Sequence, residues 1–148
     1  MEFLDYLDRT EVEIIRIVEK SGYKIEENTP LCLLSDDYVG FLEKRRKVIV
    51  LCTKNAKRRE GYTHIRKRDK DIFERTALHI KKALRHEAVH VAQECNDGKI
   101  LKIEKKFLMN VSKTKALNGS IKISGEEEKE RQAYILEDKP KLVKKVLK

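Results

Sequence analysis

The sequence predicts one small α+β domain that spans residues 1–148. A chain of 148 residues can form one hydrophobic core but is too short for a two-domain enzyme or an eight-stranded βα barrel. Hydrophobic residues make up 40% of the chain, which excludes an intrinsically disordered protein, although aromatic residues make up only 6%. Apolar residues recur at helical spacing in several segments and form short β-branched runs in two others. The fold should therefore combine helices with a small sheet.

The N-terminal segment, residues 2–20, is expected to be helical. Its apolar side chains follow nearly helical spacing, with a short interruption around Arg9 and Thr10. Gly22 suits the left-handed conformation that commonly ends a helix, so the helix should stop just before it. Acidic residues are mixed into the apolar ones, which is unlike the uninterrupted apolar region of a secretory signal.

Two short β-branched and apolar runs predict a small antiparallel sheet or hairpin. The runs cover residues 38–42 and 47–52, and the polar residues between them suit a turn. The second run is apolar on both faces, so its strand should lie inside the sheet. Residues 23–34 are expected to be irregular, because Pro30 lacks the N–H group that a central strand needs.

The clearest helix is predicted over residues 71–94. Its apolar residues step by three and four without a break, which gives one continuous apolar stripe. Asn96, Asp97 and Gly98 stop the helix. The stripe consists of Phe73, Ala77, Ile80, Leu84, Ala88, Val91 and Cys95, so the Cys95 thiol is expected to be buried.

Two shorter helices are expected near the C-terminus, after an ambiguous segment at residues 100–123. Ser124 and Glu127 form a capping-box pattern that starts a helix running through Leu136. Pro140 suits the first turn of a last helix, where a missing N–H group costs nothing.

Basic residues are concentrated in residues 54–70, which are predicted to be a long exposed loop because they show little periodicity. The chain has a net charge of +9, so this loop could contact nucleic acid or an acidic partner. The alternative is a solvated loop without a partner. Tyr62 is its only aromatic residue, and the lack of further aromatic residues for base stacking favours the alternative.

Cys32, Cys52 and Cys95 form an odd, widely spaced set. Such a set predicts free thiols in a reducing compartment, because a disulfide framework needs an even and denser set. No stretch approaches the ~20 apolar residues that a membrane span needs. We therefore expect a soluble cytoplasmic protein, or one carried in a virion if a phage encodes it. The oligomeric state is not predicted.

Residues 86–90 read His-Glu-Ala-Val-His, an H-E-x-x-H motif within the long helix. His86 and His90 are one turn apart, so their imidazoles share a face, about 6 Å from each other, and can bind one zinc ion. Glu87 points about 100° around the helix, beside the metal, where a carboxylate can act as general base on metal-bound water. The alternative is a surface helix with two incidental histidines.

A catalytic zinc site also needs a third protein ligand. The downstream candidates are Cys95, Asp97 and the acidic residues of the 126–138 helix. The extended H-E-x-x-H-x-x-G-x-x-H motif is absent, because Gln93 and Asn96 stand where Gly and His are required. Since Cys95 falls on the core stripe, a carboxylate on the second helix is favoured.

The HEAVH motif followed by Glu130-Arg131-Gln132-Ala133-Tyr134 resembles the gluzincin zinc metallopeptidases. These enzymes pair an H-E-x-x-H helix with a second helix that carries E-x-x-A. The resemblance covers about residues 71–138 and implies a minimal zincin-like domain. The segment RHEAVHVAQ is also similar to short H-E-x-x-H proteins of bacteria and their phages.

The resemblance implies a role for individual residues. It assigns His86, His90 and Glu130 as zinc ligands, Glu87 as general base and Ala133 as the small residue between the two helices. It also implies that the strand over residues 47–52 binds an extended peptide along its edge.

Some positions leave alternatives open. Tyr134 stands where many relatives carry an Asp or Asn that orients a ligand histidine, and it is a candidate transition-state donor together with Tyr62 and His64. Glu126, Glu127, Glu128 and Glu137 are rivals of Glu130, although Glu127 and Glu128 are better explained by the helix N-terminus.

The predicted function is zinc-dependent hydrolysis of peptide bonds, with a peptide or protein as substrate. Zinc is favoured because the set combines two histidines, one carboxylate and an adjacent base. One alternative is a non-catalytic zincin-like structural or assembly protein, such as a phage particle component. The other is a basic nucleic-acid-binding module.

Overall fold

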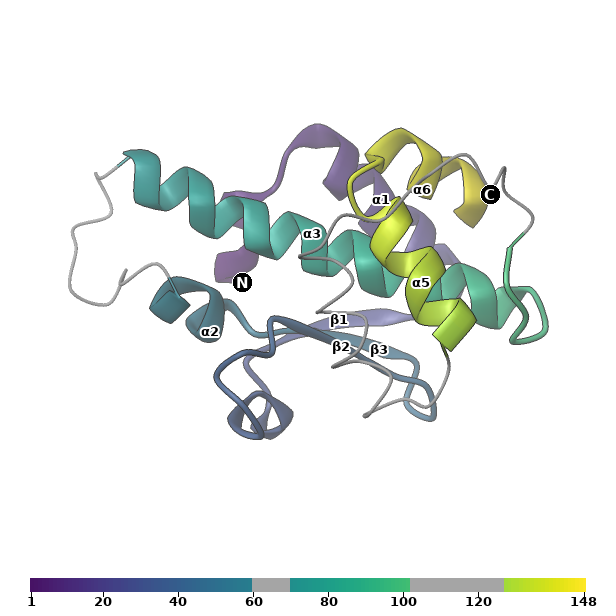
Figure 1. Ribbon diagram of the computed structural model, residues 1–148, viewed down its shortest axis with the longest axis horizontal. Helices are drawn as coiled ribbons and strands as arrows, with labels where there is room; N and C mark the ends of the chain where they lie inside the picture. Colours follow the sequence, from purple (N-terminus) through teal and green to yellow (C-terminus); the bar gives the residue numbers. More distant parts are fainter. Residues whose placement is uncertain (60–69, 102–126) are drawn as a thin grey trace.

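A long helix, α3 (Lys70–Cys95), runs through the centre of the molecule, and the other elements pack around it (Figure 1). The computed structural model describes residues 1–59, 70–101 and 127–148. The described part has an α+β fold, as predicted, with a small mixed sheet. Its other elements are η1 (Glu2–Tyr6), α1 (Arg9–Lys20), β1 (Lys24–Glu27), η2 (Pro30–Leu33), β2 (Gly40–Glu43), β3 (Val48–Leu51), α2 (Thr53–Arg59), α5 (Glu127–Leu136) and α6 (Pro140–Leu147).

Helix α3 forms where its continuous apolar stripe predicts it. Ile80, Leu84 and Val91 are fully buried. The helix ends through Gly98, whose φ of 72° is left-handed and whose N–H donates to the carbonyl of Gln93 at 3.0 Å. The predicted burial of Cys95 is wrong. Cys95 is exposed, because it occupies the last position of the helix, beyond the packed core.

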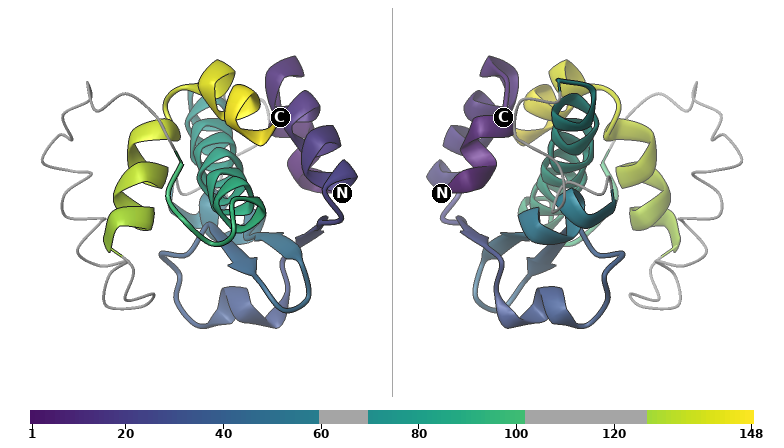
Figure 2. Two further views of the ribbon diagram at one scale, coloured as in Figure 1. Left: turned by 90° about the vertical axis from the view of Figure 1, so that its right-hand side faces the viewer. Right: turned by 90° about the vertical axis from the view of Figure 1, so that its left-hand side faces the viewer.

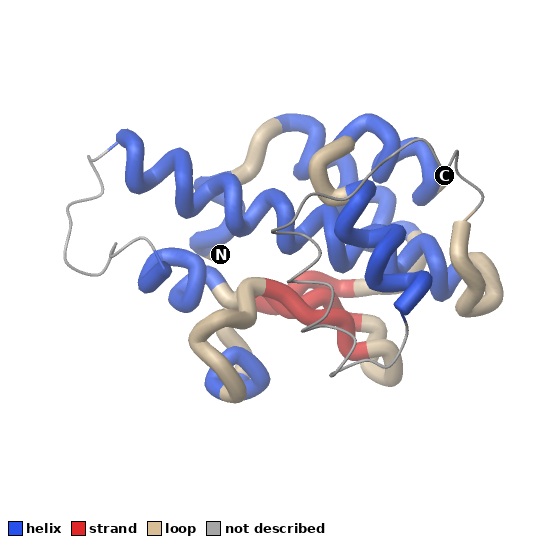
Figure 3. The backbone as a smooth tube through the Cα atoms, in the orientation of Figure 1, coloured by secondary structure: helices blue, strands red, loops and turns tan. Residues whose placement is uncertain are grey.

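The elements surround α3 on several sides (Figure 2). The sheet lies along one side of α3 and α6 lies on the opposite side, while α1 and α5 flank it. Figure 3 shows the resulting arrangement, with the longer helices above a small sheet. The fully buried side chains that fill the centre come from most of these elements: Ile14, Val18, Ile49, Leu51, Ile80, Leu84, Leu136 and Val143.

The sheet contains the predicted hairpin, but it is mixed rather than antiparallel. Strands β2 and β3 pair antiparallel, as predicted, and β1 adds to the other side of β3 in parallel, with Ile25 opposite Ile49. The irregular structure predicted for residues 23–34 is therefore wrong over Lys24–Glu27. Strand β1 has a single buried residue, Ile25, so its sequence carries almost no alternation, and Pro30 acts only after the strand has ended.

The strand order β1-β3-β2 also corrects the implied peptide-binding edge. Strand β3 is paired on both sides, so residues 47–52 do not offer a free edge. Among the described strands, β2 is an edge strand, and it packs against α3. The apolar character of both faces of β3 already predicted an interior position.

The predicted loop over residues 54–70 begins with a helix instead. Helix α2 covers Thr53–Arg59, and its Ala56 is fully buried. Seven residues are too few to show a helical period against so many lysines and arginines. The remainder of that predicted loop, the ambiguous 100–123 segment beyond residue 101 and the expected cap at Ser124 lie outside the described residues.

Cys32 and Cys52 form a disulfide, so the prediction of free thiols is wrong for these two residues. Helix η2 and the end of β3 are 20 residues apart in the chain but adjacent in space, with a Cα–Cα distance of 5.6 Å. Asn55 holds the same loop by donating to the carbonyls of Cys32, Ser35 and Tyr38. The cysteine argument for a reducing compartment therefore no longer holds.

The predicted C-terminal helices are present. Helix α5 ends at Leu136, and Pro140 opens α6 in its first turn. At the N-terminus, the predicted helix is divided into η1 and α1, and the break lies at Leu7 and Asp8 rather than at the expected interruption. No helix in the described ranges has the length and apolar character needed to cross a bilayer.

Candidate metal centre

Two helices bring three potential metal-binding side chains together. His86 and His90 lie on one face of α3, and Glu130 lies in the first turn of α5, which packs against α3. Ala133, the predicted small residue of the second helix, is fully buried and allows α5 to approach α3 closely.

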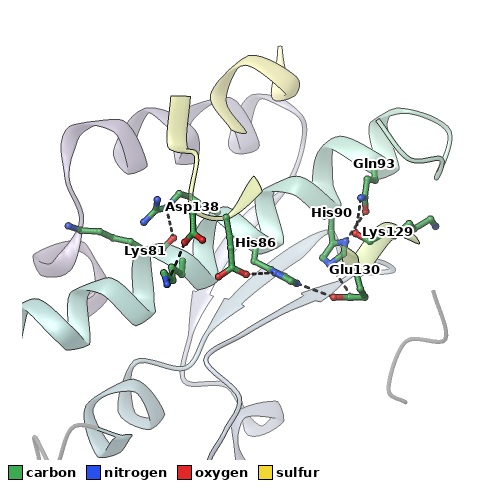
Figure 4. A network of polar contacts seen from close by, with 10 residues as sticks. Lys81, His86, His90, Gln93, Lys129, Glu130 and Asp138 are labelled. Atoms are coloured by element: carbon green, nitrogen blue, oxygen red, sulfur yellow. Dashed lines mark hydrogen bonds and ion pairs between the residues drawn. The ribbon is translucent and has the colours of Figure 1, made fainter. Parts of the chain in front are cut away.

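The Glu130 carboxylate points toward both imidazoles (Figure 4). Its Oε2 lies 3.1 Å from Nε2 of His86, and its Oε1 lies 3.1 Å from Nε2 of His90. The ligand atoms of the three residues all lie within 4.8 Å of one another. His86 and Glu130 are each 9% exposed, so the cluster is largely shielded from solvent.

The spacing of these atoms could accommodate a metal ion. With ligand bonds of about 2.1 Å, the ligand atoms of a tetrahedral site lie about 3.4 Å apart. The two imidazole–carboxylate distances of 3.1 Å are close to that value. Two imidazole nitrogens and one carboxylate are also the ligand set of a catalytic zinc site that keeps a position open.

The far nitrogen of each imidazole is also held by a side chain. Nδ1 of His86 lies 3.1 Å from Oε1 of Glu137, and Nδ1 of His90 lies 2.8 Å from Oε1 of Gln93. Such contacts are typical of metal-binding histidines, because they orient the ring and direct Nε2 at the metal. Glu137, one of the predicted rivals of Glu130, therefore contacts the opposite side of His86 instead of joining the cluster.

Neither partner was identified from the sequence, although a signal for Glu137 exists. Glu137 follows Glu130 by seven residues, which is about two helical turns, so the sequence places both carboxylates on one face. Gln93 was considered only as a residue that breaks the extended motif. Its contact with His90 follows from the i, i+3 spacing on α3.

Carboxylates on both sides of the His86 ring favour its protonated form. Burial alone would lower the pKa of His86, but its hydrogen bonds to Glu130 and Glu137 and the nearby charge of Glu87 raise that pKa to about 10. Burial would raise the pKa of Glu130, but its hydrogen bonds to His86 and His90 hold that pKa well below its usual range. Positive charge on the His86 imidazole thus lies where a metal cation would bind.

Glu87 lies beside the cluster and faces strand β2. It is 7% exposed, and burial raises the pKa of its carboxyl group. A methyl group added at Gly40 would come within 3.1 Å of Cβ of Ala83 and 3.4 Å of Cγ of Glu87. The absence of a side chain at Gly40 therefore allows the edge strand to approach this carboxylate closely.

Tyr134 also contacts the cluster, through its ring. The ring centroids of Tyr134 and His86 are 4.5 Å apart, with the planes inclined by 63°. The other transition-state candidates, Tyr62 and His64, lie outside the described residues.

The remaining ligand candidates do not join the cluster. Glu127 is exposed and pairs with Arg131 at 2.9 Å, and Glu128 is also exposed. Cys95 and Asp97 are exposed near the end of α3, and within the described residues neither belongs to the cluster. Glu126 lies outside those residues.

The fold and this cluster define an α+β protein with a candidate His–His–Glu metal centre between two helices. The chain belongs to the family described as Domain of unknown function (DUF8637), whose family model matches residues 3–148. No curated protein and no solved structure matches the chain. The family description names no activity, so the resemblance to gluzincins stays a prediction.

Proposed function

We propose that this protein is a zinc-dependent metallopeptidase in which His86, His90 and Glu130 bind the metal and Glu87 is the general base. The observation that carries the proposal is the convergence of both Nε2 atoms on one buried carboxylate, with both Nδ1 atoms held from behind. A buried Glu next to such a cluster is suited to serve as general base in metal-assisted hydrolysis.

Glu87 is suited to moving protons. A bound zinc ion would acidify its water and polarise the scissile carbonyl. The raised pKa of Glu87 brings that carboxylate closer to neutral pH, where a group both takes and returns a proton efficiently. Glu87 would take a proton from water and then donate it to the leaving amine.

Strand β2 is the element best placed to hold a substrate peptide. It is an edge strand among the described strands, and Gly40 brings it against Glu87. An extended peptide that pairs with this edge would place its backbone beside the base. Tyr134, next to His86, is the described candidate for a donor to the transition state.

The experiment compares the parent with Glu87→Gln and His86→Ala. Each protein is purified without an affinity tag, its zinc content is measured by elemental analysis, and its cleavage of a broad peptide library is followed by mass spectrometry. The parent and Glu87→Gln should each hold one zinc ion per chain. His86→Ala should hold none, because two remaining ligands do not complete the site.

Cleavage should separate the enzyme from a scaffold. Glu87→Gln is expected to cleave about 10²–10⁴-fold more slowly than the parent, because only the proton transfer is lost. Equal cleavage by both proteins would exclude Glu87 as the base. Zinc in both proteins with cleavage by neither would favour a non-catalytic structural role instead.

A further inference from the structure

We propose that Gln93 and Gln132 are positioning residues that fix the orientation of His90 toward the metal through a relay of amide hydrogen bonds. The proposal rests on the proposed metal site and assigns a role to two side chains that the ligand motif does not include. The relay begins at the backbone of Leu101, passes through Gln132 on α5 and Gln93 on α3, and ends at Nδ1 of His90.

The backbone of Leu101 determines how the Gln132 amide is turned. The N–H of Leu101 donates to Oε1 of Gln132 at 2.8 Å, and Nε2 of Gln132 donates to the carbonyl of Leu101 at 2.7 Å. A backbone N–H only donates and a backbone carbonyl only accepts, so the two ends of this amide cannot be exchanged. Gln132 is 7% exposed, which keeps water from replacing either bond.

The orientation of Gln132 then determines that of Gln93. Nε2 of Gln93 donates to Oε1 of Gln132 at 3.0 Å and to the carbonyl of Lys129 at 3.1 Å. Both partner oxygens accept hydrogen bonds, so the amino group of Gln93 must face them and its Oε1 must face His90. Gln93 is 1% exposed, so this amide has no solvent-facing alternative.

His90 is the last member of the relay. Because Oε1 of Gln93 only accepts, Nδ1 of His90 must carry a proton and donate it across their 2.8 Å contact (Figure 4). Nε2 is then the nitrogen that can present a lone pair to a metal, on the side that faces Glu130.

Gln93 also ties the two ligand-bearing helices together. Its amide donates to the carbonyl of Lys129, the residue before Glu130. The same amide contacts the ring of His90, so it holds both that ring and the first turn of α5. His86 is oriented by a carboxylate, Glu137, whereas His90 is oriented by a neutral amide that adds no charge to a site with several carboxylates.

The test uses three variants and two measurements. Gln93→Met removes the acceptor at His90 with little change in side-chain length, and Gln132→Met breaks the relay one step earlier. Asn96→Ala is the matched control, because Asn96 donates to the carbonyls of Lys99 and Ile100 and so holds the same loop without contacting His90. Zinc affinity is measured by competition with a chelator, and the imidazole N–H signals of the zinc-loaded proteins are observed by ¹H–¹⁵N NMR.

Gln93→Met should weaken zinc binding by about 10–100-fold and remove the protected Nδ1–H signal of His90. Gln132→Met should change both quantities in the same direction but less, and Asn96→Ala should resemble the parent.

Unchanged zinc affinity or a retained His90 signal in folded Gln93→Met would overturn the relay, as would an equal loss in Asn96→Ala. If Gln93→Met does not fold, parent-like affinity and signal in Gln132→Met would overturn it. A parent that binds no zinc would instead overturn the proposed function, and the positioning role with it.

Discussion

Three glutamates near the C-terminus, Glu127, Glu130 and Glu137, have different contacts, so their substitutions should be separable. Glu130 faces both Nε2 atoms, Glu137 holds only Nδ1 of His86, and Glu127 is an exposed partner of Arg131. Glu130→Gln should therefore weaken zinc binding most, and Glu137→Gln should weaken it by about 10–100-fold through the orientation of the ring. Glu127→Gln should leave the zinc affinity unchanged.

Chelator competition on the three purified proteins measures this order directly. Glu127→Gln is the matched control, because it makes the same chemical change on the same helix. A larger loss of zinc affinity in Glu137→Gln than in Glu130→Gln would mean that Glu137 is the ligand and that Glu130 is its neighbour.

At the scale of the element, Gly40 decides how closely β2 approaches the proposed base. Gly40→Ala would place a methyl group 3.1 Å from Cβ of Ala83 and 3.4 Å from Cγ of Glu87. Overpacking of this kind typically costs about 1–3 kcal/mol. We expect zinc binding to persist, since no ligand is touched. The kcat of the proposed peptidase reaction should fall in the folded variant, because Glu87 or the strand must shift.

Gly22→Ala provides a control for Gly40→Ala. Gly22 has a φ of 91°, and a methyl group there would meet nothing within 4 Å, so its substitution strains only the backbone. Gly22→Ala should lower stability by about 1–2 kcal/mol and leave kcat at the parent value. A parent-like kcat in zinc-loaded Gly40→Ala would mean that the close approach of β2 does not matter for catalysis.

A helix or strand can be predicted from the sequence when its own residues repeat the pattern often enough. Helix α3 is 26 residues long, so its apolar stripe repeats many times and was identified with its ends nearly correct. Strand β1 has four residues with one buried, and α2 has seven, so neither contains enough repeats for a period. Strand β1 forms because β3 offers it a pairing edge, and that information lies elsewhere in the chain.

The same limit applies to the candidate site. His86, Glu87 and His90 lie within five consecutive residues, so helix geometry alone brings them together. The contacts of Glu137 and Gln93 depend on how α5 docks on α3, which no spacing within one helix describes. The disulfide between Cys32 and Cys52 was missed for a similar reason, since counting cysteines says nothing about spatial proximity.

At the scale of the whole molecule, the candidate site and the core share their supporting elements. Helix α3 carries both histidines and also the buried stripe, and α5 contributes Glu130 to the site and Leu136 to the core. A metal held by both helices would bind the folded chain and not the unfolded one. Zinc should therefore stabilise the entire fold, by an amount that grows with its affinity.

The stability of the fold should depend on pH even without a metal. The pKa of His86 is raised from 6.5 to about 10 in the metal-free protein, so its interactions with the two carboxylates stabilise the fold fully below pH 6.5 and are lost as the pH rises toward 10. The pKa of Glu130 is lowered from 4.5, so its contribution is present above pH 4.5 and is lost on acidification. These two groups therefore stabilise the metal-free fold most between pH 4.5 and pH 6.5.

Zinc reverses the upper part of this dependence, because Nε2 of His86 must lose its proton before it can bind a metal. Below pH 10, each ion bound should release at least this proton, and the affinity should rise about tenfold per pH unit for each proton released. The increase in Tm on adding zinc should therefore be larger at about pH 8.5 than at about pH 6.5.

Thermal unfolding at both pH values, with zinc or with a chelator, measures this increase in Tm. Calorimetry in buffers of different ionisation enthalpy counts the protons released. His86→Ala is the control and should show no zinc-dependent increase at either pH. An increase in the parent that is independent of pH, with no proton released, would mean that zinc binds without displacing the His86 proton and hence at another place.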